Sequence, residues 1–353
     1  MSVEPLAIQP LKVICLESLL NSEFPEEVFI GGGLLCRYER MLLAADSKAG
    51  KSTLLTQILR CLSEGKPFLG FEVPKARSVL FMQAELREKR LKDRMTPTGK
   101  LLSQEAQRLF QICSTEGLIM FDDSKDLDRV KKTLDIVKPD VLTIDPMANF
   151  HMSDENSSRD MMMFLRILDR LKADFNLSII MSTHFRKGAQ TGSIMEMIRG
   201  SGALKGWADT NICIEGHQGD KSQHLEFELR NSDDIHKRIL FYNRDTKSFD
   251  WKDTLRMVIN WTIEILSLED MPTNKFVQSM IVQCGDYVSS NRTKAYKMKE
   301  TLVSKGVILE FKNGKVHLLR LNPMCIYKHD TNLDSDTQQQ VERGQKASPS
   351  LLT

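Results

Sequence analysis

The sequence lacks the features of a disulfide-stabilised, zinc-binding or membrane-spanning protein. Its seven cysteines are scattered, with no C-x-x-C pair and no cluster of cysteine with histidine. An odd number of unclustered cysteines argues against a disulfide framework and fits a reducing compartment. No apolar run approaches the ~18 residues that a membrane span needs, and no basic segment followed by an apolar core marks a signal peptide. We therefore expect a cytoplasmic protein without a membrane partner.

Net charge is also nearly absent from the chain. Its 49 Lys and Arg residues are balanced by 47 Asp and Glu residues, which gives a formal charge of +2. A chain of this charge is not a basic nucleic-acid coat, so any nucleic-acid surface must be local. The length of 353 residues allows two domains, or one large domain with an appendage.

Short apolar runs alternate with longer amphipathic stretches from Arg40 onward, after a lead-in (residues 1–24) without a clear period. Strands that alternate with helices are typical of a parallel sheet flanked by helices. Toward residue 252 little room is left for helices, which indicates a last group of adjacent, partly antiparallel strands. The expected strands are residues 41–45, 78–85, 140–145 and 177–184, and the expected helices are residues 51–64 and 161–175.

The segment AADSKAGKSTLLTQ (residues 44–57) nearly matches the phosphate-binding pattern G-x-x-x-x-G-K-[ST]. In such a loop backbone N–H groups surround phosphate oxygens, and the following helix adds its positive N-terminal end. The lysine reaches the β- and γ-phosphates, and the hydroxyl binds Mg²⁺. The pattern thus predicts a site for ATP and Mg²⁺, formed by Ser47, Lys48, Ala49, Gly50, Lys51, Ser52 and Thr53. The alternative is a helix start that contains Gly-Lys-Ser by chance.

Ala45 stands where the pattern has its first glycine. That glycine relieves crowding where the chain leaves the strand and contacts no phosphate through a side chain. Alanine has the smallest alternative side chain, and it fits if its φ is negative. We therefore expect the substitution to be compatible with nucleotide binding.

Other predicted strands also end on polar residues. Asp145 follows the apolar run VLTI and is predicted to hold Mg²⁺ together with Ser52. Glu85 ends SVLFMQAE and is predicted to activate the attacking water, because ligands bind at the carboxyl ends of parallel strands. Its alternative is to cap a helix that begins at Leu86. His184 is predicted to sense the γ-phosphate, and its alternative is an ordinary polar residue at a strand end.

Together these segments resemble the RecA-like P-loop ATPases. Within them the closest resemblance is to the RepA-type hexameric replicative helicases of plasmids, in the AAA_25 branch, and a more distant one is to DnaB-type helicases. The resemblance covers about Phe24 to Trp251. It is carried by DSKAGKST (residues 46–53), LFMQAE (80–85), VLTIDP (141–146), STHFRK (182–187) and IRGSGALKGWAD (198–209). It implies a homo-hexameric ring with ATP between subunits and single-stranded DNA passing through.

The resemblance further implies that a neighbouring subunit supplies an arginine to each ATP site. DnaB-type helicases carry a K-x-R near the end of the sheet. The stretch that looks similar here is ELRN, with Arg230 in the arginine position and Glu228 where lysine is expected. Arg199 is the second candidate. The alternative for both is an arginine that is exposed or ion-paired within its own chain.

Two loops are implied to face the channel of such a ring. The loop of residues 185–200 carries glycines together with Arg186 and Lys187, which are predicted to contact a DNA backbone. The loop of residues 149–160 is acidic and polar, and its charge favours a solvated linker over a DNA-binding loop.

Residues 255–325 have the pattern of a separate small domain. Amphipathic helices are expected at residues 274–285 and 289–306, followed by two alternating strands around the Asn-Gly turn at residues 313–314. The order helix, turn, helix, hairpin is the winged-helix pattern.

This C-terminal region is locally basic, because residues 284–320 contain eight Lys and Arg residues against three Asp and Glu residues. Such local charge is the footprint of a nucleic-acid surface. The alternative is a protein-docking module with solvated lysines. The residues predicted to contact duplex DNA are Lys294, Lys297 and Lys305. Residues 327–353 are polar and are predicted to be disordered.

The sequence therefore predicts an α/β fold, in which a RecA-like, mostly parallel sheet flanked by helices (residues 25–252) precedes a small C-terminal winged-helix domain. The predicted function is an ATP-dependent DNA motor, a RepA/DnaB-like helicase in DNA replication of a plasmid, phage or integrated element. One alternative is an ATP-switched DNA-binding regulator or loader without unwinding activity. Another is a RecA-like recombination or repair mediator.

Overall fold

The computed structural model describes most of the chain, and several predicted residues lie outside its described parts. Those outside are residues 1–12 of the lead-in, Arg186, Lys187, Arg199 and the predicted tail, residues 327–353. The described residues are 13–114, 119–155, 157–185, 194–198, 202–216, 222–232, 235–267, 269–288, 292–314 and 316–322.

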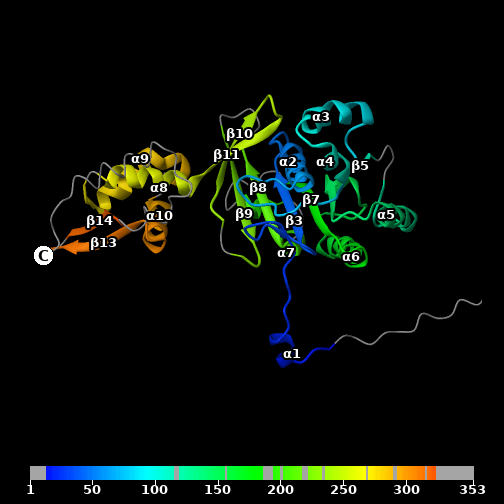
Figure 1. Ribbon diagram of the computed structural model, residues 1–353, viewed down its shortest axis with the longest axis horizontal. Coiled ribbons are helices and arrows are strands. Elements are labelled where there is room, and N and C mark those ends of the chain that lie inside the picture. Colours follow the sequence, from blue (N-terminus) through cyan, green and yellow to red (C-terminus); the bar gives the residue numbers. More distant parts are fainter. Residues whose placement is uncertain are drawn as a thin grey trace, which may run out of the picture.

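A nine-stranded sheet forms the centre of the molecule, in the order β11-β10-β9-β8-β3-β7-β6-β4-β5 (Figure 1). From β8 to β5 neighbouring strands pair in parallel, and β9, β10 and β11 extend the sheet antiparallel. The mixed sheet confirms the predicted fold class. Its strands are β3 (Arg40–Ala45), β4 (Val79–Gln83), β5 (Phe110–Ser114), β6 (Val141–Asp145), β7 (Ser178–His184), β8 (Thr210–Glu215), β9 (Gln223–Leu229), β10 (Arg238–Asn243) and β11 (Ser248–Asp253).

Helices cover both faces of this sheet, as its side-chain alternation requires. In β3, Met41 and Leu43 point to one apolar core and Leu42 to the other. The first core is closed by α2 (Lys51–Glu64) and the second by α5 (Ser124–Val137) and α6 (Ser158–Asp174). Both layers are mainly apolar, so strands buried on both faces read as nearly continuous apolar runs in the sequence. The remaining helical segments here are α3 (Glu88–Lys100), α4 (Gln104–Leu109), α7 (Gly202–Trp207) and the 3-10 turns η1 (Met147–Asn149) and η2 (Ile194–Met197).

The boundaries differ from the sequence prediction in particular places. The helix expected from Leu86 begins at Glu88, and the helix expected from Met161 begins at Ser158. Strand β5 was not predicted, because its five residues FQICS carry only a short, partly polar alternation and it lies at the edge of the sheet.

The chain before the sheet forms two small elements. Helix α1 (Leu16–Leu20) lies within the predicted lead-in, and β1 (Val28–Ile30) pairs antiparallel with β2 (Leu35–Cys36). Figure 1 shows α1 below the body of the sheet, joined to it by an extended segment.

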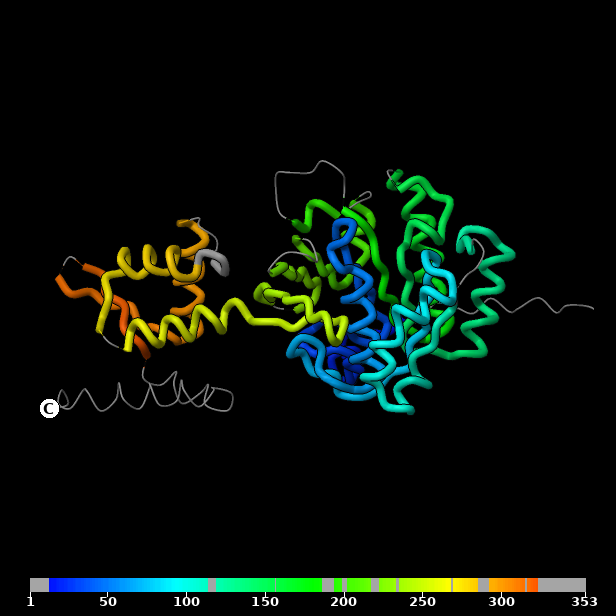
Figure 2. Tube along the Cα trace, turned by 90° about the horizontal axis from the view of Figure 1, so that it is seen from above, coloured from blue at the N-terminus to red at the C-terminus, as the bar shows by residue number. Residues whose placement is uncertain are grey.

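The C-terminal region contains the predicted helices and hairpin, packed around their own apolar core. Figure 2 shows α8 leaving the sheet directly after β11. A short strand that was not predicted, β12, pairs with β14, so that the sheet order is β12-β14-β13. The winged-helix assignment itself stays a prediction. The elements are α8 (Thr254–Leu266), β12 (Met271–Pro272), α9 (Thr273–Val288), α10 (Arg292–Ser304), β13 (Ile308–Asn313) and β14 (Val316–Leu321).

Among the described residues, no helix has the length and apolar character needed to cross a bilayer. The cysteines in the described part of the chain are free thiols, as expected from their scattered positions.

Candidate nucleotide site

The phosphate-loop segment joins β3 to α2 with a tight, left-handed turn. Gly50 precedes the first residue of α2 with φ of 84°, a conformation that glycine adopts without a steric cost. Ala45, in contrast, is the last residue of β3, where it pairs with His184 on β7 and Ile214 on β8. It is fully buried and does not have a positive φ. The backbone at Ala45 therefore has the conformation that alanine needs in order to replace the first glycine of the loop pattern.

A cleft of about 210 Å³ opens at the carboxyl ends of the parallel strands. It brings together side chains from the turn after β3, the start of α2, and the ends of β4, β6 and β7, as expected for ligand binding in an open α/β sheet. Most of the predicted nucleotide residues line it. These are Ser47, Lys48, Gly50, Lys51, Ser52, Thr53, Glu85, Asp145 and His184.

Ala49 is the exception among the predicted nucleotide residues. Its side chain is fully buried beneath the loop and does not line the cleft. Its carbonyl oxygen accepts a hydrogen bond of 2.8 Å from Nε2 of Gln223, the buried first residue of β9. Ala49 thus anchors the loop to the sheet instead of facing a ligand with its side chain.

Lys51 is a buried cation at the centre of the cleft. Its side chain is almost inaccessible (7% exposed). Nζ donates to the carbonyl oxygen of Thr183 at 3.1 Å and lies 3.1 and 3.2 Å from the ring nitrogens of His184. Burial lowers the pKa of Lys51, while the carboxylates of Asp145 and Glu85 act in the opposite direction. The buried Lys51 ammonium therefore lies within electrostatic reach of two carboxylates of the cleft.

Asp145 is held in place by a neighbouring strand. It is only 5% exposed, and the hydroxyl of Ser182 on β7 donates a hydrogen bond to its Oδ1 atom. Ser52 lines the same cleft. A hydroxyl and a carboxylate oxygen that face one cleft are the hard oxygen ligands that Mg²⁺ takes. The residues present therefore fit the predicted Mg²⁺ site.

Glu85 lies in a short turn that Gln83 fixes. The Gln83 side chain donates to the carbonyl oxygen of Leu86 at 2.8 Å and accepts from its N–H at 2.8 Å. Since α3 begins at Glu88 with Arg87 at the N-cap position, the alternative that Glu85 caps a helix starting at Leu86 is wrong. Its carboxylate instead faces the cleft.

Arg94 is a cleft residue that the sequence analysis missed. It lines both the cleft and a smaller pocket beside it, which Ser52, Glu85 and Asp145 also line. Arg94 lies on α3 one turn after the buried Leu91, so both residues share one helix face. That spacing is visible in the sequence, but it does not tell that this face of the helix lies beside the cleft.

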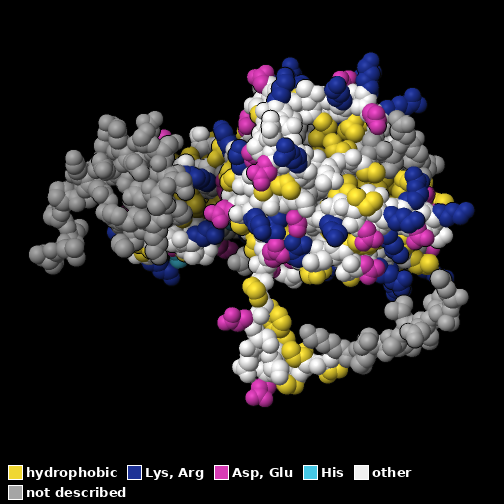
Figure 3. Space-filling model, turned by 45° about the vertical axis from the view of Figure 1, so that its right-hand side comes forward, with side chains coloured by type: hydrophobic (Ala, Val, Ile, Leu, Met, Phe, Trp, Pro, Cys, Tyr) yellow, Lys and Arg dark blue, Asp and Glu magenta, His cyan; other side chains and the backbone are white. Residues whose placement is uncertain are grey.

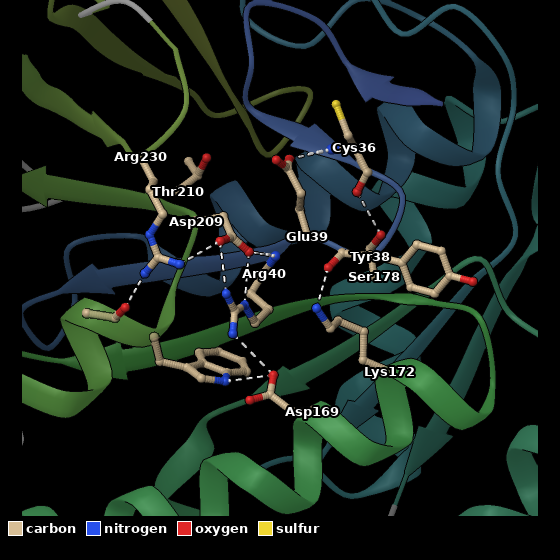
Figure 4. A network of polar contacts seen from close by, with 12 residues as sticks. Cys36, Tyr38, Glu39, Arg40, Asp169, Lys172, Ser178, Asp209, Thr210 and Arg230 are labelled. Atoms are coloured by element: carbon tan, nitrogen blue, oxygen red, sulfur yellow. Dashed lines mark hydrogen bonds and ion pairs between the residues drawn. The ribbon is translucent and has the colours of Figure 1, made fainter. Parts of the chain in front are cut away.

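Arg230 has partners within its own chain (Figure 4). It forms an ion pair with Asp209 at 3.0 Å and donates to the carbonyl oxygen of Gly206. Glu228, which stands where a lysine was expected, pairs with Lys205 at 2.9 Å. These contacts match the ion-paired alternative, although the Arg230 side chain is still 43% exposed. Its role toward a neighbouring subunit stays a prediction.

The predicted DNA-contacting residues are in two different situations. Lys294, Lys297 and Lys305 are exposed along and just after α10, whereas Lys299 is buried against Glu310. Arg186 and Lys187, with the second arginine candidate Arg199, lie outside the described residues.

The loop of residues 149–160 is not the simple solvated linker that its charge suggested. His151 is buried, and its ring lies 4.6 Å from the ring of Phe164 on α6. Burial lowers the pKa of His151, while Glu155 and Asp122 oppose that shift. The acidic composition of this loop hid its buried aromatic residues, since Phe150 is also fully buried and its ring lies 5.7 Å from that of Phe121.

The AAA_25 family, described as an AAA domain, matches residues 4–190. The chain belongs to the AAA_25 family. The matched segment contains the phosphate-loop turn, Glu85, Asp145 and His184.

The chain also has weak similarity to a solved structure. Among solved structures, a KaiC-like protein from the hyperthermophilic archaeon Pyrococcus horikoshii OT3 is 14% identical, with a TM-score of 0.46. The similarity covers 64% of this chain and 93% of that protein. No curated protein matches the chain.

Proposed function

We propose that this protein is an ATP hydrolase that drives movement along DNA, a RepA/DnaB-like helicase acting in DNA replication of a plasmid, phage or integrated element. One observation carries the ATPase part of the proposal. Lys51, Asp145 and Glu85 come from separate parts of the sequence and line a single cleft at the carboxyl edge of the sheet. A cation, a metal-binding carboxylate and a second carboxylate are the groups that phosphoryl transfer to water requires.

Several residues of the cleft have a part in the proposed mechanism. Lys51 and the backbone N–H groups of the loop bind the phosphates of ATP. Ser52 and Asp145 would hold Mg²⁺, which would supply positive charge to neutralise the phosphate oxygens. Glu85 accepts the proton of the attacking water. His184 contacts Lys51, so a change at the γ-phosphate can reach the chain after β7 through this contact.

The proposed motor is a homo-hexameric ring in which a neighbour completes each cleft. Arg230 is proposed for this role, with Arg199 as the second candidate. Arg230 would have to exchange its bond to Asp209 for a phosphate of the neighbour. Its partial exposure is compatible with that exchange. An arginine that a neighbouring subunit supplies to the site can raise the rate of phosphoryl transfer by roughly 10³-fold or more.

DNA contact is proposed at two places. Single-stranded DNA would pass the loop that carries Arg186 and Lys187. Duplex DNA would bind the proposed winged helix through Lys294, Lys297 and Lys305. Neutralising each phosphate contributes about 0.9 to the slope of binding against salt concentration. Replacing these three lysines by alanine would therefore lower that slope by up to about 2.7 and leave ATP hydrolysis unchanged.

A second function is favoured by the separate ion pairs that Arg230 and Glu228 form within the chain. An arginine that is already satisfied by Asp209, next to a glutamate in place of a lysine, argues for a weak contact between subunits. The protein would then be an ATP-switched DNA-binding regulator or loader. Slow hydrolysis would only reset its state.

One experiment separates the two functions. ATP hydrolysis is measured without nucleic acid, with single-stranded DNA and with duplex DNA, and strand displacement is measured in parallel. Lys51→Ala serves as the blank. The motor proposal predicts strong stimulation by single-stranded DNA together with ATP-dependent strand displacement, both absent from the blank. ATP binding without stimulated hydrolysis or displacement would contradict the motor and favour the switched DNA-binding protein.

A further inference from the structure

Strand β7 ends on three polar residues that each contact a member of the candidate nucleotide site. The carbonyl oxygen of Thr183 accepts a hydrogen bond from Nζ of Lys51, and the ring of His184 lies 3.1 Å from the same atom. These two residues therefore support the phosphate lysine. The hydroxyl of Ser182 donates instead to Oδ1 of Asp145, the predicted Mg²⁺ ligand. Ser182 has no part in the proposed mechanism, and its place beside the metal ligand calls for one.

The register of the sheet brings Ser182 and Asp145 together. Strands β6 and β7 are parallel neighbours, and Ile144 on β6 pairs with Met181 on β7. The next residues along the two strands are Asp145 and Ser182, so their side chains lie on the same face of the sheet. Ile180, two residues earlier on β7, points into the core that α2 closes. Ser182 therefore faces α2 as well, the helix that begins in the phosphate-loop turn.

The contact between Ser182 and Asp145 is closed to solvent. Figure 3 shows acidic and basic side chains interspersed over one face of the molecule, where water and salt screen their interactions. Ser182, in contrast, is 0% exposed and Asp145 only 5%. A hydrogen bond is electrostatically stronger in such surroundings than in water, so the hydroxyl holds the carboxylate firmly.

This hydrogen bond fixes the direction of the Asp145 carboxylate. The last side-chain torsion of an aspartate has broad preferences, so an unsupported carboxylate turns easily. A donor that engages Oδ1 also sets where the second oxygen points, because the carboxylate is planar. Carboxylates that bind metal ions are commonly oriented by such hydrogen bonds, and losing one typically lowers metal affinity about 10–100-fold.

We propose that Ser182 is a positioning residue for Mg²⁺, whose hydroxyl holds Asp145 in the orientation that binds the metal ion together with Ser52. This inference rests on the proposed nucleotide site and adds to it a residue that touches neither nucleotide nor metal. Removing the hydroxyl weakens the binding of Mg²⁺. It leaves the binding of the metal-free nucleotide unchanged, because Lys51 and the backbone N–H groups of the loop hold the phosphates.

Ser178, at the opposite end of β7, offers a matched control. It is also a fully buried serine, and its hydroxyl donates to the carbonyl oxygen of Cys36 at 2.8 Å. It precedes Ser182 by four residues and therefore lies on the same face of the strand. Ser178→Ala thus removes a comparable buried hydrogen bond from the same strand. An effect of Ser182→Ala that comes only from a weakened strand will appear in Ser178→Ala as well.

The first test measures nucleotide binding directly, without hydrolysis. Isothermal titration calorimetry on the full chain gives the dissociation constant of AMP-PNP, a non-hydrolysable ATP analogue, in EDTA and in excess Mg²⁺. The ratio of the two constants is the gain in nucleotide affinity that Mg²⁺ supplies. We expect this ratio to be about tenfold smaller in Ser182→Ala than in the wild type, with the constant in EDTA changed by no more than about twofold.

Two further variants show whether the hydroxyl acts on the metal. Ser178→Ala is expected to keep the wild-type ratio, and Ser182→Thr, which retains a hydroxyl and suits a strand, is expected to restore it. A wild-type ratio in Ser182→Ala, or an equal loss in Ser178→Ala, would overturn the role of Ser182. So would a Ser182→Thr protein that binds AMP-PNP in EDTA but has the low ratio. A wild type that gains no affinity from Mg²⁺ would instead refute the proposed Mg²⁺ site, and this inference with it.

A second test follows the rate of ATP hydrolysis as free Mg²⁺ is raised. Ser182→Ala is expected to need about tenfold more Mg²⁺ for its half-maximal rate, because only the affinity for the metal is lowered. Its kcat at saturating Mg²⁺ should approach that of the wild type. A kcat that stays low when Mg²⁺ saturates would place Ser182 in the chemical step and contradict a positioning role.

Discussion

The two edges of the central sheet both carry charged side chains, but in opposite arrangements. At the carboxyl edge Lys51, Glu85 and Asp145 line an open cleft. At the amino edge Arg40, the first residue of β3, is closed off by Asp209 at 2.9 Å and by Asp169 at 3.2 Å (Figure 4). The difference indicates which edge is built for a ligand and which for stability.

The same pattern extends across the amino edge. Arg37 pairs with Asp140 at 2.7 Å, and Asp140 accepts hydrogen bonds from the N–H and the hydroxyl of Ser78. Burial would raise the pKa of Asp140, but the hydrogen bonds from Arg37 and Ser78 lower it overall. These groups tie together the starts of β4 and β6. Substitutions at this edge are therefore expected to change stability, and those at the carboxyl edge to change ATP turnover.

The largest expected effect is that of Lys51→Ala. Among the described residues of the cleft, Lys51 is the only buried cation. Its removal takes away both the binding of the phosphates and the stabilisation of their negative charge. Turnover should fall by about 10³-fold or more, in line with the loss of a preorganised electrostatic group. The melting temperature stays at or above the wild-type value, because a buried, partly desolvated charge is removed. ATPase assays and calorimetry on the same sample check both parts.

The next largest effect is expected for Arg40→Ala at the amino edge, where stability should fall and ATP turnover should not. It leaves Asp209 and Asp169 without their shared cation, and we expect a loss of about 2–3 kcal/mol of unfolding free energy. Lys205→Ala breaks the more exposed pair with Glu228 and should cost about 0.5 kcal/mol or less. Chemical denaturation measures both. A large loss of ATP turnover in folded Arg40→Ala would break the distinction between the two edges.

A smaller effect is expected for Arg94→Ala. Arg94 lies at the rim of the cleft on α3 and is exposed, so its charge acts partly through water. We expect KM for ATP to rise about tenfold, the order of one charge-assisted hydrogen bond, with kcat changed little. Arg90→Ala on the same helix is the control. A change in kcat alone would instead place Arg94 in the transition state.

The smallest effect concerns pH. A hydrogen bond from Arg37 holds the pKa of Glu27 at about 2, against an ordinary value of 4.5. A carboxyl with a lowered folded pKa stabilises the fold above its unfolded pKa and loses this contribution as the pH falls toward the folded value. Unfolding free energy should therefore decrease from pH 4.5 toward about 2, and the decrease should be smaller in Glu27→Gln. Equal slopes in both proteins would contradict the assignment.

The carboxyl edge was readable from the sequence, and the amino edge was not. The loop pattern is contiguous, and Glu85, Asp145 and His184 each follow an apolar run, so one rule about strand ends places them together. Arg40 and Asp209 are separated by 169 residues, and no local pattern pairs them. Their contact depends on β3 and β8 being neighbours, which only the strand order decides.

The same reasoning explains the other differences. Arg94 was missed because α3 approaches the cleft from the side, and a helix position gives no sign of what it faces. The edge strand β5 was missed because its alternation is short. The turn at Glu85 was misjudged by a few residues, since the Gln83 side chain replaces the helix that was expected to begin there.

Glu85→Gln gives the most direct test of the claim that the carboxyl edge is a working hydrolysis site. ATP affinity and single-turnover hydrolysis are measured on the same preparation, beside the wild type. We predict that ATP binds within about twofold of the wild-type affinity, while hydrolysis falls by roughly 10²–10⁴-fold, as for loss of a general base. Hydrolysis that persists at the wild-type rate would contradict the proposed role of Glu85 and, with it, the central claim about the cleft.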